Sequence, residues 1–174
     1  MDLHQTIFEV IDMRSFSNLW YWIGLAVMWS TASHWVLGVP WDMAIRARRK
    51  GGRLEEDFEA LVRIYTARLV HIAEVSGLML TSLIPFLLTV LGVLGFYYRI
   101  EFAQAVFLMA FPMTLVWILS IRTAQKVRAA DETGEELHRR LARHRISVQA
   151  IGIVSIFFTA MWGMLQNFSI GVLG

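Results

Sequence analysis

The chain has 174 residues, of which 56% are hydrophobic and 17% are charged, and its formal net charge is +2 at pH 7. This apolar content exceeds that of ordinary soluble domains, and one soluble core of this length has no room for several long uncharged runs. The small net charge argues against nucleic acid as a partner. The sequence contains no cysteine, which excludes disulfides, thiolate metal sites and acylated cysteines.

The first long uncharged run covers residues 15–41, and a basic segment follows it at once. About 20 apolar residues, at a rise of about 1.5 Å per residue, cross the hydrocarbon layer of a bilayer. We therefore expect a first membrane span over residues 19–39, with tryptophans near both ends and Pro40 ending or bending the helix. Before this span, the apolar spacing within residues 2–14 predicts a short N-terminal interfacial helix.

From residue 54 onward, apolar residues recur every three or four positions, and this amphipathic pattern runs without a break into the next uncharged run. We expect one helix over residues 54–97, whose second part is a membrane span over residues 72–97. Two further uncharged runs predict spans over residues 102–121 and 146–165. The sequence thus predicts four membrane-spanning helices.

Fourteen of the sixteen Lys and Arg residues lie in the connecting segments 42–70 and 122–145, and the other two are Arg14 and Arg99. By the positive-inside rule these connectors are cytoplasmic, so both termini are expected on the periplasmic side of a bacterial inner membrane. The predicted fold is an all-α polytopic membrane protein. It is a four-transmembrane-helix bundle in a single integral-membrane domain, with cytoplasmic helical extensions.

Three ionisable side chains near the expected cytoplasmic boundary are candidates for cofactor binding: His34, His71 and Glu74. His34 and Glu74 each lie about 7–10 Å inside that boundary at the helical rise per residue, with Gln149 at a similar depth. One interpretation is an interhelical hydrogen bond between His34 and Glu74. The alternatives are a quinone, lipid-headgroup or proton-handling site, and a haem b held by His34 and His71. We expect no catalytic residue, metal site or cofactor from any other motif.

Two basic faces in the connectors are candidates for binding anionic lipid headgroups, at about 1 kcal/mol per residue. Enforcement of topology explains the same residues equally well. Their members are Arg46, Arg48, Arg49, Lys50, Arg53, Arg139, Arg140, Arg143 and Arg145. Acidic residues in both connectors, including Glu55 and Glu135, indicate that the two helical extensions pair by charge.

Small residues at four-residue spacing, Ser155, Thr159 and Gly163, form a stripe on the last span. Such stripes allow close approach of helices, either within the chain or with a partner. After the loop that contains Thr133, Glu136 stands at the spacing of a capping box for the next helix.

Residues 13–43, MRSFSNLWYWIGLAVMWSTASHWVLGVPWDM, resemble the opening of small inner-membrane proteins of alphaproteobacteria, some of which carry the label "component of the SufBCD complex". The resemblance implies association with a larger assembly, and it carries over no catalytic or binding residue. We therefore expect a non-enzymatic accessory or scaffold subunit, in contact with anionic lipids and with a protein partner or further copies of itself. The alternative is a redox or lipid/quinone-binding membrane protein that uses the His34/Glu74 layer.

Overall fold

The computed structural model describes residues 15–171, which fold into five α-helices with short intervening elements. A 3₁₀ turn, η1 (Ser15–Ser17), leads into α2 (Leu19–His34), and a small hairpin, β1 (Trp35–Val36) and β2 (Val39–Pro40), leads into α3 (Trp41–Lys50). The three long helices follow: α4 (Arg53–Gly92) with its π-helical end η2 (Val93–Tyr97), α5 (Glu101–Ala130) and α6 (Gly134–Gly171). The expected interfacial helix over residues 2–14 lies outside the described residues.

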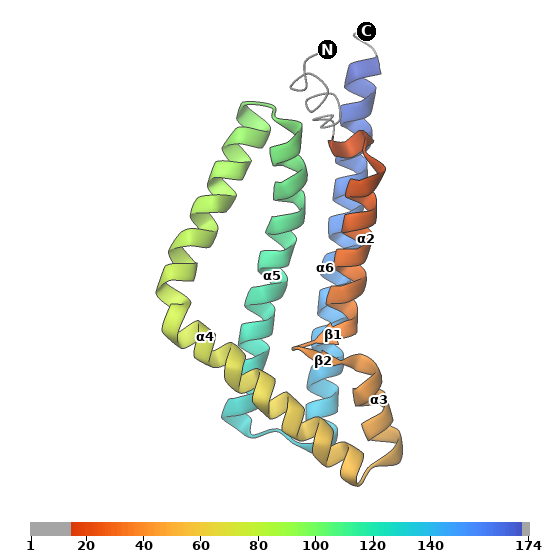
Figure 1. The fold of residues 1–174 in the computed structure, drawn as a ribbon, viewed down its shortest axis with the longest axis vertical. Coiled ribbons are helices and arrows are strands. Elements are labelled where there is room, and N and C mark those ends of the chain that lie inside the picture. Colours follow the sequence, from red (N-terminus) through yellow and green to blue (C-terminus); the bar gives the residue numbers. More distant parts are fainter. Residues whose placement is uncertain (1–14, 172–174) are drawn as a thin grey trace, which may run out of the picture.

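Three segments are long and apolar enough to cross a membrane: Arg53–Tyr97, Glu101–Ala130 and Gly134–Phe168. They contain the predicted spans 72–97, 102–121 and 146–165. The protein therefore has the helices of a multi-pass membrane protein. In Figure 1 these helices and α2 run roughly along the long axis of the molecule, with α3 and the first half of α4 gathered at one end.

The prediction of a first helix over residues 19–39 is wrong at its end, because α2 stops at His34. The chain then reverses in an antiparallel hairpin that pairs Trp35 with Pro40. Its two turn residues, Leu37 (φ 53°) and Gly38 (φ 86°), are both left-handed, as the tightest hairpin turns require. Pro40 does not end α2; it immediately precedes α3. At 16 residues, α2 is shorter than an ordinary membrane span.

The prediction of one helix from the connector into the second span is confirmed. Helix α4 continues from Arg53 to Gly92 and passes directly into η2. Figure 1 shows that α4 bends between a first half that passes in front of the lower ends of α5 and α6 and a second half that runs back along α5. Residues 71–92 of α4 include no buried residue, so the apolar surface of this part has to be covered by lipid or by a partner.

The small-residue stripe of α6 is covered within the chain: Thr159 and Gly163 lie against α2 and η1, and Ser155 lies on the side of α5. Ser155 and Thr159 are buried, and a Cβ on Gly163 would lie 3.3 Å from Trp22 Cζ2. One turn before this stripe, a Cβ on Gly152 would lie 2.8 Å from Trp29 Cε3, so the Trp29 ring sits directly on the α6 backbone. The absence of side chains at these glycines therefore sets the distance between α2 and α6.

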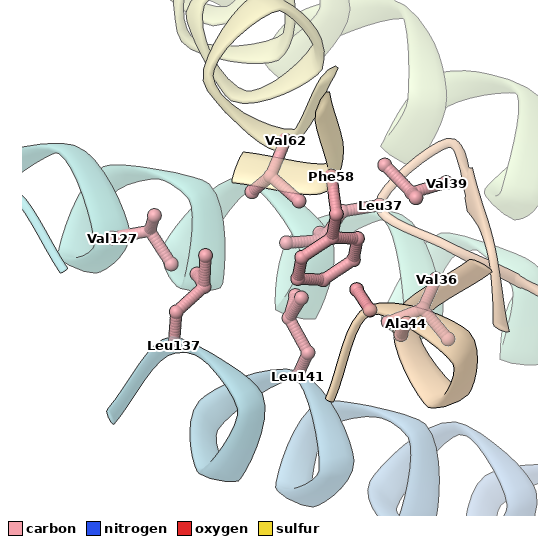
Figure 2. Close-up of a cluster of buried hydrophobic side chains, with 10 residues drawn as sticks. Val36, Leu37, Val39, Ala44, Phe58, Val62, Val127, Leu137 and Leu141 are labelled. Carbon is pink, nitrogen blue, oxygen red and sulfur yellow. The ribbon is translucent and has the colours of Figure 1, made fainter. Parts of the chain in front are cut away.

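A hydrophobic core lies at the end of the molecule that holds the connectors (Figure 2). We call this region the connector module; it comprises the hairpin, α3, the first half of α4, the end of α5 and the start of α6. Phe58 of α4 lies between Ala44 of α3 and Leu141 of α6, and Val62 lies on the side of Val127. Besides Phe58 and Val62, the buried members are Val36, Leu37, Val39, Ala44, Ala47, Val127, Leu137 and Leu141. Segments far apart in the sequence thus close over one shared apolar centre.

Candidate functional site at the connector module

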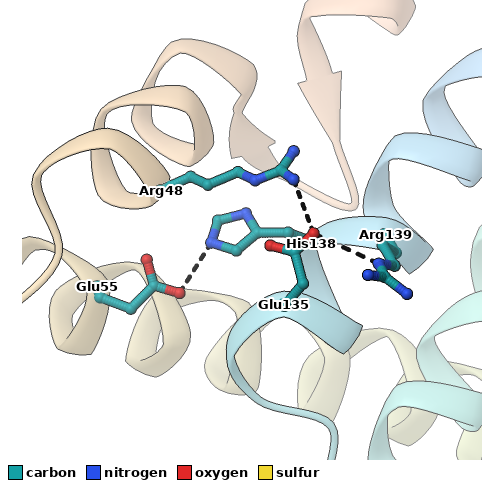
Figure 3. A network of polar contacts seen from close by, with 5 residues as sticks. All are labelled: Arg48, Glu55, Glu135, His138 and Arg139. Carbon is teal, nitrogen blue, oxygen red and sulfur yellow. Dashed lines mark hydrogen bonds and ion pairs between the residues drawn. The ribbon is translucent and has the colours of Figure 1, made fainter.

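A largely buried polar contact of the connector module joins α4 to α6 through His138. The His138 side chain is 5% exposed, and its Nε2 lies 2.8 Å from Glu55 Oε1 (Figure 3). Its ring stacks on Phe58 with 4.9 Å between centroids and 6° between planes. The imidazole N–H donates to the carboxylate, which offsets the cost of burying a polar ring. The expectation that the two extensions pair is confirmed here, although through a histidine that the sequence analysis did not single out.

A more exposed set of ion pairs joins α3 to α6. Arg48 Nη2 lies 2.7 Å from Glu135 Oε1, and Arg139 Nε lies 3.4 Å from the same oxygen (Figure 3). Each of these side chains is about half exposed or more, so each pair contributes little to stability on its own. Of these two pairs, Arg48–Glu135 links α3 to α6, whereas Arg139 and Glu135 both lie on α6.

Carboxylates also organise the turn between α5 and α6. Glu59 Oε1 accepts a hydrogen bond of 2.6 Å from the backbone N–H of Gly134, the first residue of α6. Glu132 is buried, and Arg140 donates to both of its oxygens. That pairing raises the pKa of Arg140 above its ordinary value. No hydrogen bond of the predicted Thr133–Glu136 capping box is present among the described residues, and the first N–H of α6 is instead satisfied by Glu59 of α4.

The nine predicted lipid-binding residues fall into two groups. Arg46, Arg48, Arg139 and Arg140 form ion pairs with carboxylates of this chain. Arg145 donates to the Ser33 carbonyl and lies 4.9 Å over the Trp41 ring. The second group has no carboxylate partner in the part of the chain that the structure describes. Its members, all exposed, are Arg49, Lys50, Arg53 and Arg143.

The three predicted cofactor-binding residues lie near the same end of the molecule. His34 is 52% exposed, and its Nε2 is 3.8 Å from Asp42 Oδ1. His71 and Glu74 are exposed on α4. Within residues 15–171, no hydrogen bond or ion pair joins any two of His34, His71 and Glu74, and no cluster of three His, Cys, Asp or Glu side chains is arranged to hold a metal ion.

His144 is a buried polar residue that the sequence analysis missed. It is 5% exposed, and its Nδ1 lies 3.1 Å from Thr123 Oγ1 on α5. Because the Thr123 hydroxyl donates to the Leu119 carbonyl, the imidazole donates its Nδ1–H to Thr123. Burial lowers the pKa of His144 to about 4, so the ring is neutral near pH 7. Its spacing from Leu141 and Val148 places it on the buried face of α6, a signal that the sequence did contain.

Comparison with known proteins gives no match to a family model, to a curated protein or to a solved structure. The connector module combines the packed contacts of His138 with Glu55 and Phe58 and a set of exposed basic side chains that have no carboxylate partner among the described residues. Exposed cations of this kind are suited to binding a negatively charged partner and to orienting that partner on the surface.

Proposed function

We propose that the protein is a non-enzymatic accessory or scaffold subunit of a bacterial inner membrane. In this proposal it crosses the bilayer four times, with α2 as the short first span and both termini in the periplasm. The three long apolar helices and the concentration of Lys and Arg in the two connectors support this placement. The resemblance of residues 13–43 to inner-membrane proteins labelled as part of a larger complex supports the same role.

The observation that carries the proposal is the connector module. Residues 42–70 and 122–145 fold together around one core, joined by the contacts of His138 and Glu135. A module that is already rigid loses little conformational entropy when it binds, which favours docking. Because the connector module lies at the end of the long helices, its distance from the membrane surface is fixed in this proposal.

The unpaired basic side chains indicate the chemistry of the contact. Arg49, Lys50 and Arg53 lie close together at the junction of α3 and α4, and Arg143 lies on α6. Cations without an internal partner attract acidic protein surfaces and anionic lipid headgroups. We assign the docking role to this group, rather than to the basic residues that are paired within the chain.

Photo-crosslinking in intact cells tests the proposal. A photoreactive residue replaces Arg49 or Arg143, and the control replaces Tyr98, an exposed residue in the turn that follows η2 at the other end of the molecule. We expect a discrete crosslinked species from the module positions, containing either another protein or a second, differently tagged copy of this chain. If both module positions yield only uncrosslinked monomer at native expression levels, the scaffold role is wrong.

The natural lack of cysteine makes the topology directly measurable. Single cysteines in place of Arg49 and Tyr98 are exposed to a membrane-impermeant maleimide in whole cells. We expect labelling at residue 98 without permeabilisation, and at residue 49 only after permeabilisation. The opposite pattern would contradict the proposed orientation.

A further inference from the structure

A groove lies where the hairpin, α4 and α5 meet, at the boundary between the connector module and the predicted spans. Its volume is about 330 Å³, and its walls are mainly apolar. Trp35, Tyr65, Arg68, Ile72, Met113 and Trp117 are among the residues that line it. Figure 1 shows the hairpin close to α5 and to the first half of α4, which it contacts through Tyr65. The groove is at the small end of the volume range for small-molecule pockets.

The wall between the hairpin and α4 is built by close packing. The Tyr65 ring lies against the hairpin turn, where a Cβ on Gly38 would be only 2.6 Å from Tyr65 Cδ1. Gly38 also has a positive φ of 86°, so two independent requirements favour glycine there. The early end of α2 therefore produces the hairpin, and the hairpin forms one side of the groove.

The groove is amphipathic along the predicted membrane normal. Arg68 and Ser120 lie toward the connector module, and Met113 lies seven residues earlier on α5, about 10 Å deeper at the helical rise per residue. The Ser120 hydroxyl donates its hydrogen bond to the Val116 carbonyl. Arg68 is exposed and has no carboxylate partner within the described residues, so its guanidinium is available to an anion. Tryptophan and tyrosine beside it are the residues that favour the headgroup level of a bilayer.

We propose that this groove binds one anionic phospholipid of the cytoplasmic leaflet, an inference that rests on the proposed membrane placement. Arg68 pairs with the phosphate, the aromatic rings hold the glycerol region, and the first part of an acyl chain lies against Ile72 and Met113. Charge complementarity selects the headgroup, because a guanidinium forms two parallel hydrogen bonds with a phosphate. The apolar inner end selects a lipid over a free phosphate compound, because only a lipid buries that surface.

Native mass spectrometry of the full chain in mild detergent tests the proposal, with phosphatidylglycerol and phosphatidylcholine as probes. We expect one phosphatidylglycerol to be retained in preference to phosphatidylcholine. Arg68→Ala should weaken this retention about tenfold, the equivalent of one charge-assisted hydrogen bond. The matched control is Arg63→Ala, which removes an exposed arginine from the same helix outside this groove and should leave retention unchanged.

Three results would overturn the inference: equal retention of both lipids, no effect of Arg68→Ala, or an equal effect of Arg63→Ala. Displacement of phosphatidylglycerol by an equal concentration of glycerol 3-phosphate would also overturn it, because it would identify a phosphate site without a lipid. Arg68→Lys keeps the charge and serves where the alanine variant fails to fold, with an expected loss of retention of about threefold. Loss of the lipid preference with correct maleimide labelling would reject the groove alone. Reversed maleimide labelling of residues 49 and 98 would reject the proposed membrane placement, on which the groove proposal rests.

Discussion

The His138 ring lies flat on the Phe58 ring, with 4.9 Å between centroids, while its Nε2 contacts Glu55. Phe58 is fully buried at the centre of the connector module. One residue of α6 is thereby tied to α4 through both a stacked face and a hydrogen bond. The relative position of the two long helices depends on this contact more than on the exposed ion pairs around it.

His138→Ala is expected to destabilise the connector module by about 2–3 kcal/mol, because it removes buried ring packing and leaves Glu55 without its donor. The measurement is the thermal unfolding midpoint in detergent, together with the rate of proteolysis in the Gly51–Gly52 turn. Arg139→Ala is the matched control on the next residue of α6, where the pair is exposed, and it should change stability by less than about 0.5 kcal/mol. Equal effects of the two variants would contradict the assignment.

Gly152→Ala tests the seam between α2 and α6. Alanine is preferred over glycine inside a helix by about 1 kcal/mol, but the added Cβ would lie 2.8 Å from Trp29 Cε3. We expect a net destabilisation of about 1–3 kcal/mol, since the ring has to shift. Gly77→Ala, where a Cβ meets nothing within 4 Å, should be neutral or stabilising. A double variant with Trp29→Leu should recover part of the loss, and an additive result would argue against a direct contact.

His144 predicts a specific dependence of stability on pH. Its folded-state pKa of about 4 is below the ordinary value of 6.5, so the unfolded chain takes up the proton first as the pH falls. The stabilising contribution of the neutral ring is complete above about pH 6.5 and is lost as the pH falls toward 4. The unfolding midpoint of the natural chain should therefore fall more steeply over this window than that of His144→Gln. Parallel curves for the two proteins would show that His144 titrates normally.

Arg140→Ala should be more damaging than Arg48→Ala. The first change leaves the buried Glu132 carboxylate unpaired, and the second removes one partner of the exposed Glu135. We expect about 2–3 kcal/mol for Arg140→Ala, and at most about 1 kcal/mol for Arg48→Ala. Adding Glu132→Gln to Arg140→Ala should restore part of the stability, because it removes the uncompensated charge. Equal midpoints for the two single variants would refute the difference in burial.

Glu74→Gln separates the scaffold proposal from a redox or quinone function. As an exposed side chain without a partner among the described residues, Glu74 should tolerate this change with less than about 0.5 kcal/mol of stability lost. The visible absorption spectrum of the purified protein should lack a Soret band, before and after the change. A haem absorbance that His34→Ala or His71→Ala abolishes would favour the alternative instead.

The apolar runs predicted the three long helices well, because burial in lipid requires an uninterrupted apolar stretch of defined length. The end of the first helix was missed, because the hairpin depends on two left-handed residues, Leu37 and Gly38, and Leu37 carries no local signal for that conformation. The predicted helix ended just before Pro40, at residue 39, which is five residues beyond the observed end at His34.

The candidate site was harder to predict because depth along a helix does not define rotation about its axis. His34 and Glu74 were placed at a common depth from residue counts, yet no contact in the described chain joins them. The joint at His138 depends on how α4 and α6 face each other, which is a property of tertiary packing. By contrast, the position of His144 between Leu141 and Val148 follows from helical periodicity alone.

The shortness of α2 has a consequence for the surrounding lipid. Sixteen residues make a helix about 24 Å long, which is about 6 Å less than the hydrocarbon thickness of a typical bilayer. With α2 as a span, acyl chains on that flank have to compress, while the longer α4 and α5 on the opposite flank impose no such strain. The bilayer around the molecule would then be thinned on one side only. Because this deformation costs free energy, the protein would favour thinner membrane regions and association with neighbours that have the same mismatch.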